Sequence, residues 1–463
     1  MSQRLPVTPA PEPLEAYAQC FDSFFAKRNQ RDAFRRYLEG LLLPAERNKT
    51  LTALANTEPV VGAHHRLAQA LQWFLSESTW EPQVVNTERL RLLRRDPTTA
   101  PDDHGVLIID ETGDRKAGTK TAHIGRQYLA NLGKPDNGVV SVASLWADEY
   151  VYYPLEVEPY TPAHWFQHGK ADPAFRTKPQ IGVTLVERAV AAQWPFRAIV
   201  ADSFYGENET FRTGLHRLEV GYVLALKPSH CWWHPIEEIG SLAEVAEAAV
   251  WEGPERPGAW EAVTRRFRDG HDEVWWALEA IAGPYGPEKL QRAVIVTTDP
   301  VHLPDLTTWY LVTNLPAGGN ERAATSRLEP ASLGEIVRLY SVRMWVEQSY
   351  KQVKQALGWA EYQVRGDVAI RRHWVLVWCA FSFCWWHLGH GAKEVPGWLD
   401  GAEAPAGRAP SSETGREKKS AGRRRATPAG VLASSVKEGA RMVRALANDR
   451  ALLAGVVTAA PAT

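Results

Sequence analysis

The segment from Leu339 to Lys354 combines cations, one carboxylate and a phenol at regular spacing. Steps of three or four residues separate these side chains, which predicts one helix with all of them on a single face. They are Tyr340, Arg343, Glu347, Lys351 and Lys354. A lone carboxylate among cations suits a metal ion lying against a phosphate group. The segment therefore predicts part of a site that binds phosphate groups.

Two aspartates follow apolar runs that are typical of strands. Asp110 comes after 105–109 and Asp202 comes after 198–201, and a turn containing glycine is expected beyond each. Functional sites often form at strand ends that are followed by such turns. Most of the 54 Asp and Glu residues are expected to be solvated, so position singles these two out. Two strand ends and one helix can bring three carboxylates together, and the candidate catalytic and metal-binding residues are Asp110, Asp202 and Glu347.

Three such carboxylates suit the chemistry of phosphodiesters. Cleavage is slow because the attacking oxygen meets negative charge and the leaving oxygen must carry charge away. Two divalent ions about 3.5 to 4 Å apart address both problems. Magnesium takes hard oxygen ligands and keeps several waters, so two or three carboxylates are enough. Without metal these carboxylates would repel one another, and their pKa values would rise.

The same residues carry a resemblance to a known family. The spacing of Tyr340, Arg343, Glu347 and Lys354 resembles the Tyr-Arg-Glu-Lys signature of insertion-sequence DDE transposases. Asp110 in Ile-Ile-Asp-Glu-Thr-Gly and Asp202 in Ala-Asp-Ser-Phe-Tyr-Gly resemble the family's two aspartates. The stretch 126–142 is also similar to DDE-superfamily endonucleases, and the likeness covers about residues 35–390. Glu111 is a departure, since relatives often have a second Asp there.

The resemblance implies an α/β fold: a ribonuclease-H-like mixed sheet with helices on both faces and a mostly β insertion before the last catalytic helix. It implies that Asp110, Asp202 and Glu347 hold two Mg²⁺ ions, for which Mn²⁺ substitutes. Tyr340, Arg343 and Lys354 would contact DNA phosphates. Lys351 shares their face and joins the DNA-binding candidates on that ground. An aromatic residue of the insertion would hold a flipped base, and the candidates are Trp251, Trp260, Trp275 and Trp276.

The implied reaction is attack by water at the ends of the element, followed by attack of the released 3′-hydroxyls on target DNA. The partners are then terminal inverted repeats and target DNA, bound by a homodimer. Two alternatives stay open: a domesticated DNA-binding relative, and a stand-alone structure-specific nuclease without strand transfer. A pure binder would not need the three acids, whereas only an assay separates the nuclease.

Composition limits the other classes of protein. The chain has 463 residues and a net charge of −1, so two or three units are expected and any DNA contact must use local positive charge. Four scattered cysteines and the lack of an apolar leader favour a reducing, cytoplasmic setting, with nucleoid association when bound to DNA. The apolar run 374–386 is shorter than the roughly 18 residues a membrane span needs. A glycine-rich phosphate loop is absent from the sequence, so a nucleotide cofactor is not expected.

Changes in residue pattern divide the chain. Helical spacing predicts an all-helical N-terminal domain at 1–98. Its local excess of cations from Lys27 to Arg95 fits solvated helix faces as well as DNA contact, and the domain is assigned to DNA binding. Strand patterns follow, with helices expected at 180–193 and 208–218. The predicted parts are the catalytic core, first part, 99–229; the β insertion, 230–330; the core's second part, 331–395; a linker, 396–430; and a helical tail, 431–463.

Overall fold

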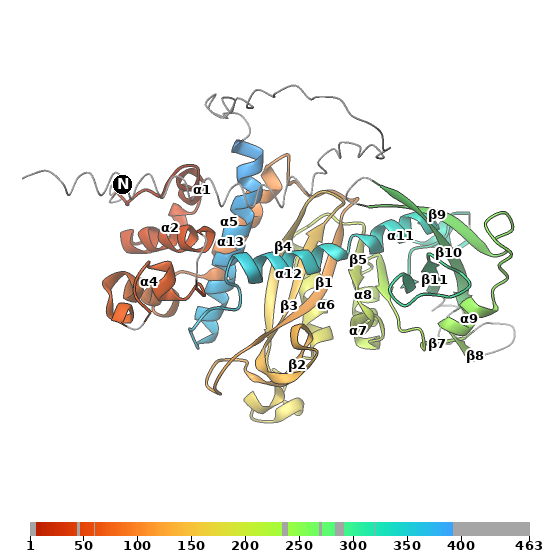
Figure 1. Cartoon of the computed structure of the whole chain (residues 1–463), viewed down its shortest axis with the longest axis horizontal. Coiled ribbons are helices and arrows are strands. Elements are labelled where there is room, and N and C mark those ends of the chain that lie inside the picture. Colours follow the sequence, from red (N-terminus) through yellow and green to blue (C-terminus); the bar gives the residue numbers. More distant parts are fainter. Residues whose placement is uncertain are drawn as a thin grey trace, which may run out of the picture.

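A computed structural model of the chain describes residues 6–43, 47–59, 61–233, 239–267, 271–282, 291–319 and 321–391 (Figure 1). The predicted linker at 396–430 and tail at 431–463 lie outside these ranges. So does part of the predicted insertion.

Helices form the N-terminal part, as its spacing predicts. They are α1 (Leu14–Gln19), α2 (Arg28–Leu42), α3 (Leu51–Leu54), α4 (Arg66–Ser76) and α5 (Pro82–Arg95). The long apolar helix α13 (Asp367–Gly391) packs against α2, α4 and α5 (Figure 1). Buried Arg89 and Arg372 donate hydrogen bonds across this packing, to Ser382 on α13 and to the carbonyl groups of 75, 78 and 80. The apolar run 374–386 is therefore the centre of a helical core.

A mixed sheet forms the middle of the molecule. Its order is β2-β3-β1-β5-β6-β12-β11-β10-β9, with β4 beside β3. Strands β1, β5 and β6 are parallel, and the other pairs are antiparallel. The first six strands are β1 (Val106–Arg115), β2 (Gly125–Leu129), β3 (Lys134–Ala147), β4 (Tyr152–Tyr160), β5 (Ala198–Ala201) and β6 (Tyr222–Ala225). The mixed α/β class expected from the sequence is confirmed.

The strands of the predicted insertion extend this sheet. They are β9 (Trp260–Arg266), β10 (Asp272–Ala282), β11 (Gln291–Thr297) and β12 (Thr308–Thr313). Strand β12 pairs with β6, so the insertion continues the core sheet at one edge. A small hairpin of β7 (Cys231–Trp233) and β8 (Ile239–Ser241) and the helix α9 (Leu242–Ala248) precede them.

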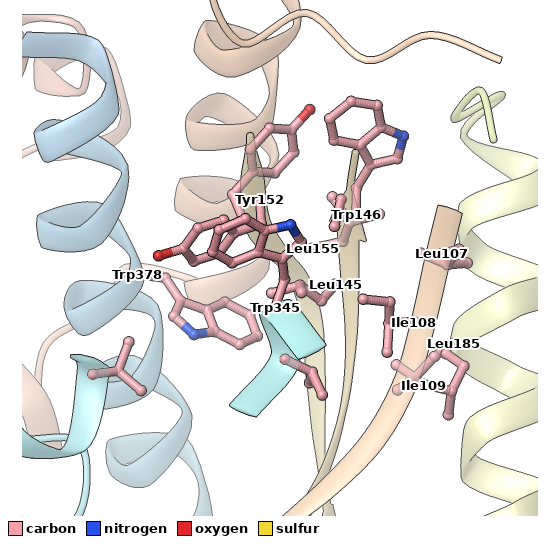
Figure 2. Packing of buried hydrophobic residues seen from close by; sticks show 14 of the residues in the cluster. Leu107, Ile108, Ile109, Leu145, Trp146, Tyr152, Leu155, Leu185, Trp345 and Trp378 are labelled. Carbon is pink, nitrogen blue, oxygen red and sulfur yellow. The ribbon is translucent and has the colours of Figure 1, made fainter. Parts of the chain in front are cut away.

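Helices cover both faces of the sheet. On one face lie α6 (Lys178–Ala191) and α8 (Glu209–Arg217); on the other lie α11 (Leu333–Ser341) and α12 (Met344–Ala356). Strand alternation divides the core accordingly: Leu107 and Ile109 point toward Leu185 of α6, whereas Ile108 points toward Trp345 of α12 (Figure 2). The Trp345 ring stacks on Tyr152 of β4 at 4.4 Å, which fixes α12 on its face.

Two expectations about the site's elements are wrong. Asp110 does not end its strand: β1 continues to Arg115, because the longer strand β3 pairs with it along its whole length and Thr112-Gly113 forms no turn. The helix expected over Leu339–Lys354 is interrupted between α11 and α12. There the Ser341 hydroxyl donates to the Arg338 carbonyl at 2.7 Å, a local bond that competes with the helical pattern.

Candidate active site

Strand register brings the two aspartates together. In the parallel pair β1 and β5, Ile109 lies opposite Ala201, and Asp110 and Asp202 are the next residues. Neighbouring strands lie about 4.8 Å apart, so the two side chains start from adjacent positions. Asp202 therefore follows the end of its strand β5, whereas Asp110 lies within β1, which continues past the site.

Asp202 is held by the start of the short helix α7 (Ser203–Gly206). Its Oδ1 accepts hydrogen bonds from the backbone N–H groups of Phe204 and Tyr205, at 3.0 and 3.4 Å. This N-cap leaves Oδ2 facing the site. The sequence Asp-Ser-Phe-Tyr-Gly thus uses one oxygen of its acid for structure and the other for the site.

Arg343 joins all three predicted acids. Its guanidinium lies 3.7 Å from Asp110 Oδ2, 3.9 Å from Asp202 Oδ2 and 3.5 Å from Glu347 Oε1. Glu347 is in the first turn of α12, with 70% of its side chain exposed, whereas Asp110 is buried. The structure therefore gathers Asp110, Asp202 and Glu347 around one cation, although they come from three separate segments.

Charge and burial perturb this cluster strongly. The pKa of Asp110 is raised to about 7, chiefly because its side chain is buried; Arg343 lowers this pKa, and nearby Asp202 contributes to the rise. Burial alone would lower the pKa of Arg343, but its carboxylate neighbours raise it above the ordinary value. Its Nε is buried without a hydrogen-bond partner in the described part of the chain. Asp110 is thus a carboxylate that a further cation would stabilise.

The cluster fits a metal in composition, but the acids are not yet in ligand geometry. Within the ranges that the structure describes, no three His, Cys, Asp or Glu side chains lie close enough to hold an ion. The Arg343 guanidinium stands between the acids instead. Asp110, Asp202 and Glu347 offer only hard oxygen donors, the type that Mg²⁺ and Mn²⁺ prefer. The Glu347 side chain lies at the exposed side of this cluster, so these residues suit a divalent ion.

Contacts along α12 fix it on β1. The Tyr350 hydroxyl donates to the backbone carbonyl of Asp110 at 3.2 Å. The Lys354 ammonium lies 2.6 Å from the carboxylate of Asp114 and donates to the Gly113 carbonyl at 3.0 Å. Lys351 is exposed on the same helix. Of the two predicted lysines, Lys351 projects into solvent and Lys354 is held against the strand.

Tyr340 lies on α11, beside the insertion strands. Burial raises the pKa of Tyr340 to about 12. Its ring contacts Trp309 at 5.1 Å, and Trp309 contacts Trp275 at 4.8 Å. The Arg265 guanidinium lies over both tryptophans, 4.4 Å from Trp275 and 4.6 Å from Trp309. Aromatic rings therefore extend from the site into the insertion.

The four tryptophans considered from sequence do not include Trp309, the tryptophan that contacts Tyr340. Trp260 and Trp275 are buried, and Trp251 and Trp276 contact each other. Trp309 instead touches Tyr340 directly. Nothing in the local pattern around Trp309 distinguishes it from its neighbours, because the pairing of β12 with β6 places it there.

Glu111 points away from the three acids. Its carboxylate binds the Lys178 ammonium at 2.6 Å and accepts a hydrogen bond from the Tyr205 hydroxyl at 3.1 Å. Tyr205 belongs to α7, which Asp202 caps. Glu111 thus ties α7 to α6.

Comparison with known proteins defines the family. The model of the DDE superfamily endonucleases matches residues 17–263, a range that includes Asp110 and Asp202 and ends before Glu347. This match spans more than half of the chain, and the chain belongs to that family. Members are metal-dependent enzymes that act on DNA.

A named relative is similar over a longer range. The chain is 32% identical over 366 residues to the probable transposase for insertion sequence element IS701 of Microchaete diplosiphon, covering 79% of this chain and 85% of the relative. Among solved structures, the NurA nuclease from Sulfolobus solfataricus aligns over 59% of this chain and 91% of its own, with 8% identity and a TM-score of 0.25. Among the described helices, none is both long and apolar enough to cross a membrane.

Proposed function

We propose that this chain is the transposase of an insertion sequence, which cuts the element's ends and joins the released 3′-hydroxyls to target DNA. The observation that carries the proposal is the convergence of Asp110, Asp202 and Glu347 on Arg343. The family and the named relative support the same function. The mixed sheet with β1, β5 and β6 in parallel supports a ribonuclease-H-like core.

In this proposal Asp110, Asp202 and Glu347 hold two Mg²⁺ ions, with Mn²⁺ as a substitute. Such ions, when bound, neutralise charge on the reacting phosphate. Arg343 would then turn from the acids to a DNA phosphate, because a guanidinium binds phosphate and carboxylate oxygens equally well in geometry. In the DNA complex, the divalent ions would thus take the place of the Arg343 guanidinium beside the three acids.

The DNA path in the proposal follows the exposed side of α12. Tyr340, Arg343 and Lys354 contact phosphates near the cleaved DNA end. The solvent-exposed Lys351 contacts the sugar-phosphate backbone of the DNA. Trp309, whose ring contacts Tyr340, supplies an aromatic surface beside this path. The active form is a homodimer on paired ends in the cytoplasm, where it associates with the nucleoid through DNA.

The function is tested with a labelled duplex that ends in the element's terminal repeat, incubated with the full chain and Mg²⁺. We expect a nick that leaves a 3′-hydroxyl at the repeat, joining of that end to a plasmid target, and no product in EDTA. Binding without cleavage would favour the domesticated relative. Cleavage without joining, also with a pre-nicked end, would favour the stand-alone nuclease.

Lys354→Ala is expected to reduce the slope of log affinity against log salt for end DNA by about one, because one phosphate contact and its released counterion are lost. Binding isotherms at several salt concentrations measure this slope. Arg327→Ala is the control, since Arg327 is an exposed cation outside α12 that pairs with Glu219. An unchanged slope for Lys354→Ala would remove Lys354 from the phosphate contacts.

A further inference from the structure

The contact between Lys354 and Asp114 is unusual for a lysine expected to bind DNA. Asp114 is 3% exposed, and the Lys354 ammonium is its ion-pair partner at 2.6 Å. A carboxylate this deeply buried is costly unless paired, so the two side chains hold each other. The Gly113 carbonyl accepts a second bond from the same ammonium. Two of the three ammonium donors are thereby directed at β1, and the third can donate to a phosphate oxygen.

The geometry of β1 and α12 explains why Asp114 meets Lys354. Asp110 and Asp114 are four residues apart on one strand, so their side chains share a face. The strand rises about 14 Å between them, and α12 rises about 16 Å between Arg343 and Lys354. The helix lies along the strand with matched contacts: Arg343 at Asp110, Tyr350 at the Asp110 carbonyl, and Lys354 at Asp114.

We infer that Asp114 is a positioning residue that fixes the Lys354 ammonium for DNA and keeps α12 in register with the acids on β1. The inference rests on the proposed function. A lysine side chain is flexible, with four carbons between its backbone and its charge. Held by Asp114 and Gly113, the ammonium occupies one place on the path to the active site. Released, it keeps its charge but loses that fixed position.

Charge and position have different experimental signatures. Loss of Lys354 removes a cation and so changes the salt dependence of end binding. Loss of Asp114 leaves the cation in the chain, so the salt slope is expected to stay as in the wild type. Cleavage, in contrast, depends on placement, and a displacement of about 1 Å can lower a rate by about a hundredfold.

The test is a double-mutant cycle on the full chain, measured as single-turnover cleavage of end DNA with Mg²⁺. Asp114→Ala is expected to lower the rate by about tenfold to a hundredfold with the salt slope unchanged. In a Lys354→Ala background, the same change is expected to lower the rate by less than about twofold, because both substitutions remove one interaction. Asp136→Asn is the matched control: Asp136 lies on β3, paired with exposed Arg115 at 3.2 Å, and its variant should cut at the wild-type rate.

Multiplicative losses in the double variant, or a wild-type rate for Asp114→Ala, would overturn the inference. If Asp114→Ala does not fold, as judged by circular dichroism, the cycle is run with Asp114→Asn. That variant keeps the shape and one acceptor oxygen, and the same criterion of coupling to Lys354 applies. A wild-type chain that does not cut end DNA would remove the proposed function and this inference with it, which differs clearly from uncoupled losses in an active chain.

Discussion

Replacing Asp110 with asparagine is expected to abolish cleavage of end DNA while leaving the binding of that DNA largely intact. The side chain keeps its size and its place beside Arg343 and Asp202, but it loses the charge that a divalent ion requires. Metal ions contribute several kcal/mol of charge stabilisation at a phosphoryl group, so the expected loss is about a thousandfold or more in rate. Single-turnover cleavage and a binding isotherm for the same duplex measure the two properties separately.

Asp202→Asn and Glu347→Gln should behave in the same way, since all three acids meet at Arg343. Asp136→Asn serves again as the control, because it also removes one carboxylate from the sheet without touching the site. Substantial Mg²⁺-dependent cutting by the Asp110 variant would contradict its assignment as a metal ligand.

Asp110→Asn is also expected to stabilise the metal-free protein at alkaline pH. Burial raises the pKa of Asp110 from an ordinary 3.8 to about 7. Below pH 3.8 the acid is protonated in both the folded and unfolded chains, and it contributes no pH-dependent difference. Between about pH 4 and 7 it ionises in the unfolded chain only, so wild-type stability falls as pH rises, and above pH 7 the loss is complete.

Asp110→Asn lacks this titration. In EDTA at pH 8 it should exceed the wild type by up to about 4 kcal/mol in the free energy of unfolding, and the gain should shrink toward zero at pH 4. Urea denaturation at both pH values measures the difference. Asp136→Asn should stay within about 0.5 kcal/mol of the wild type. A variant that is less stable than the wild type at pH 8 would show that Arg343 needs the Asp110 charge for folding.

The carboxylate cluster lowers the stability of the metal-free protein and at the same time provides ligands for metal ions. Three acids share one guanidinium at distances of 3.5 to 3.9 Å, longer than a direct charged hydrogen bond. The buried Asp110 is therefore incompletely compensated in the free protein. Divalent ions would complete that compensation, so metal binding and Arg343 compete for the same carboxylates.

Much of the fold could be predicted because the apolar pattern is regular. The strand β5 and the helices α6 and α8 lie within a few residues of their predicted bounds. The pattern of apolar residues does not show where a strand stops when its neighbour in the sheet is longer. The extension of β1 past Asp110, where it pairs with β3, was therefore missed. The pairing of β12 with β6 depends on contacts distant in sequence, so sequence gave no sign that the insertion continues the sheet.

The candidate site was predictable in its residues more than in its contacts. The spacing of side chains over 339–354 selected Arg343 and Glu347, and the apolar runs selected Asp110 and Asp202. Asp114, Tyr350 and Trp309 were missed. The even spacing of Asp114 from Asp110 would have selected it had the strand been extended, and Tyr350 lies seven residues from Arg343, two helical turns on. Trp309 reaches the site only through the strand order.

The most direct test of the central claim is anomalous diffraction from crystals of the full chain bound to cleaved end DNA and Mn²⁺. We expect anomalous peaks among the carboxylates of Asp110, Asp202 and Glu347, with the Arg343 guanidinium moved from the acids to a phosphate. Peaks at other carboxylates, or an Arg343 that still joins the three acids in the DNA complex with Mn²⁺ present, would contradict it.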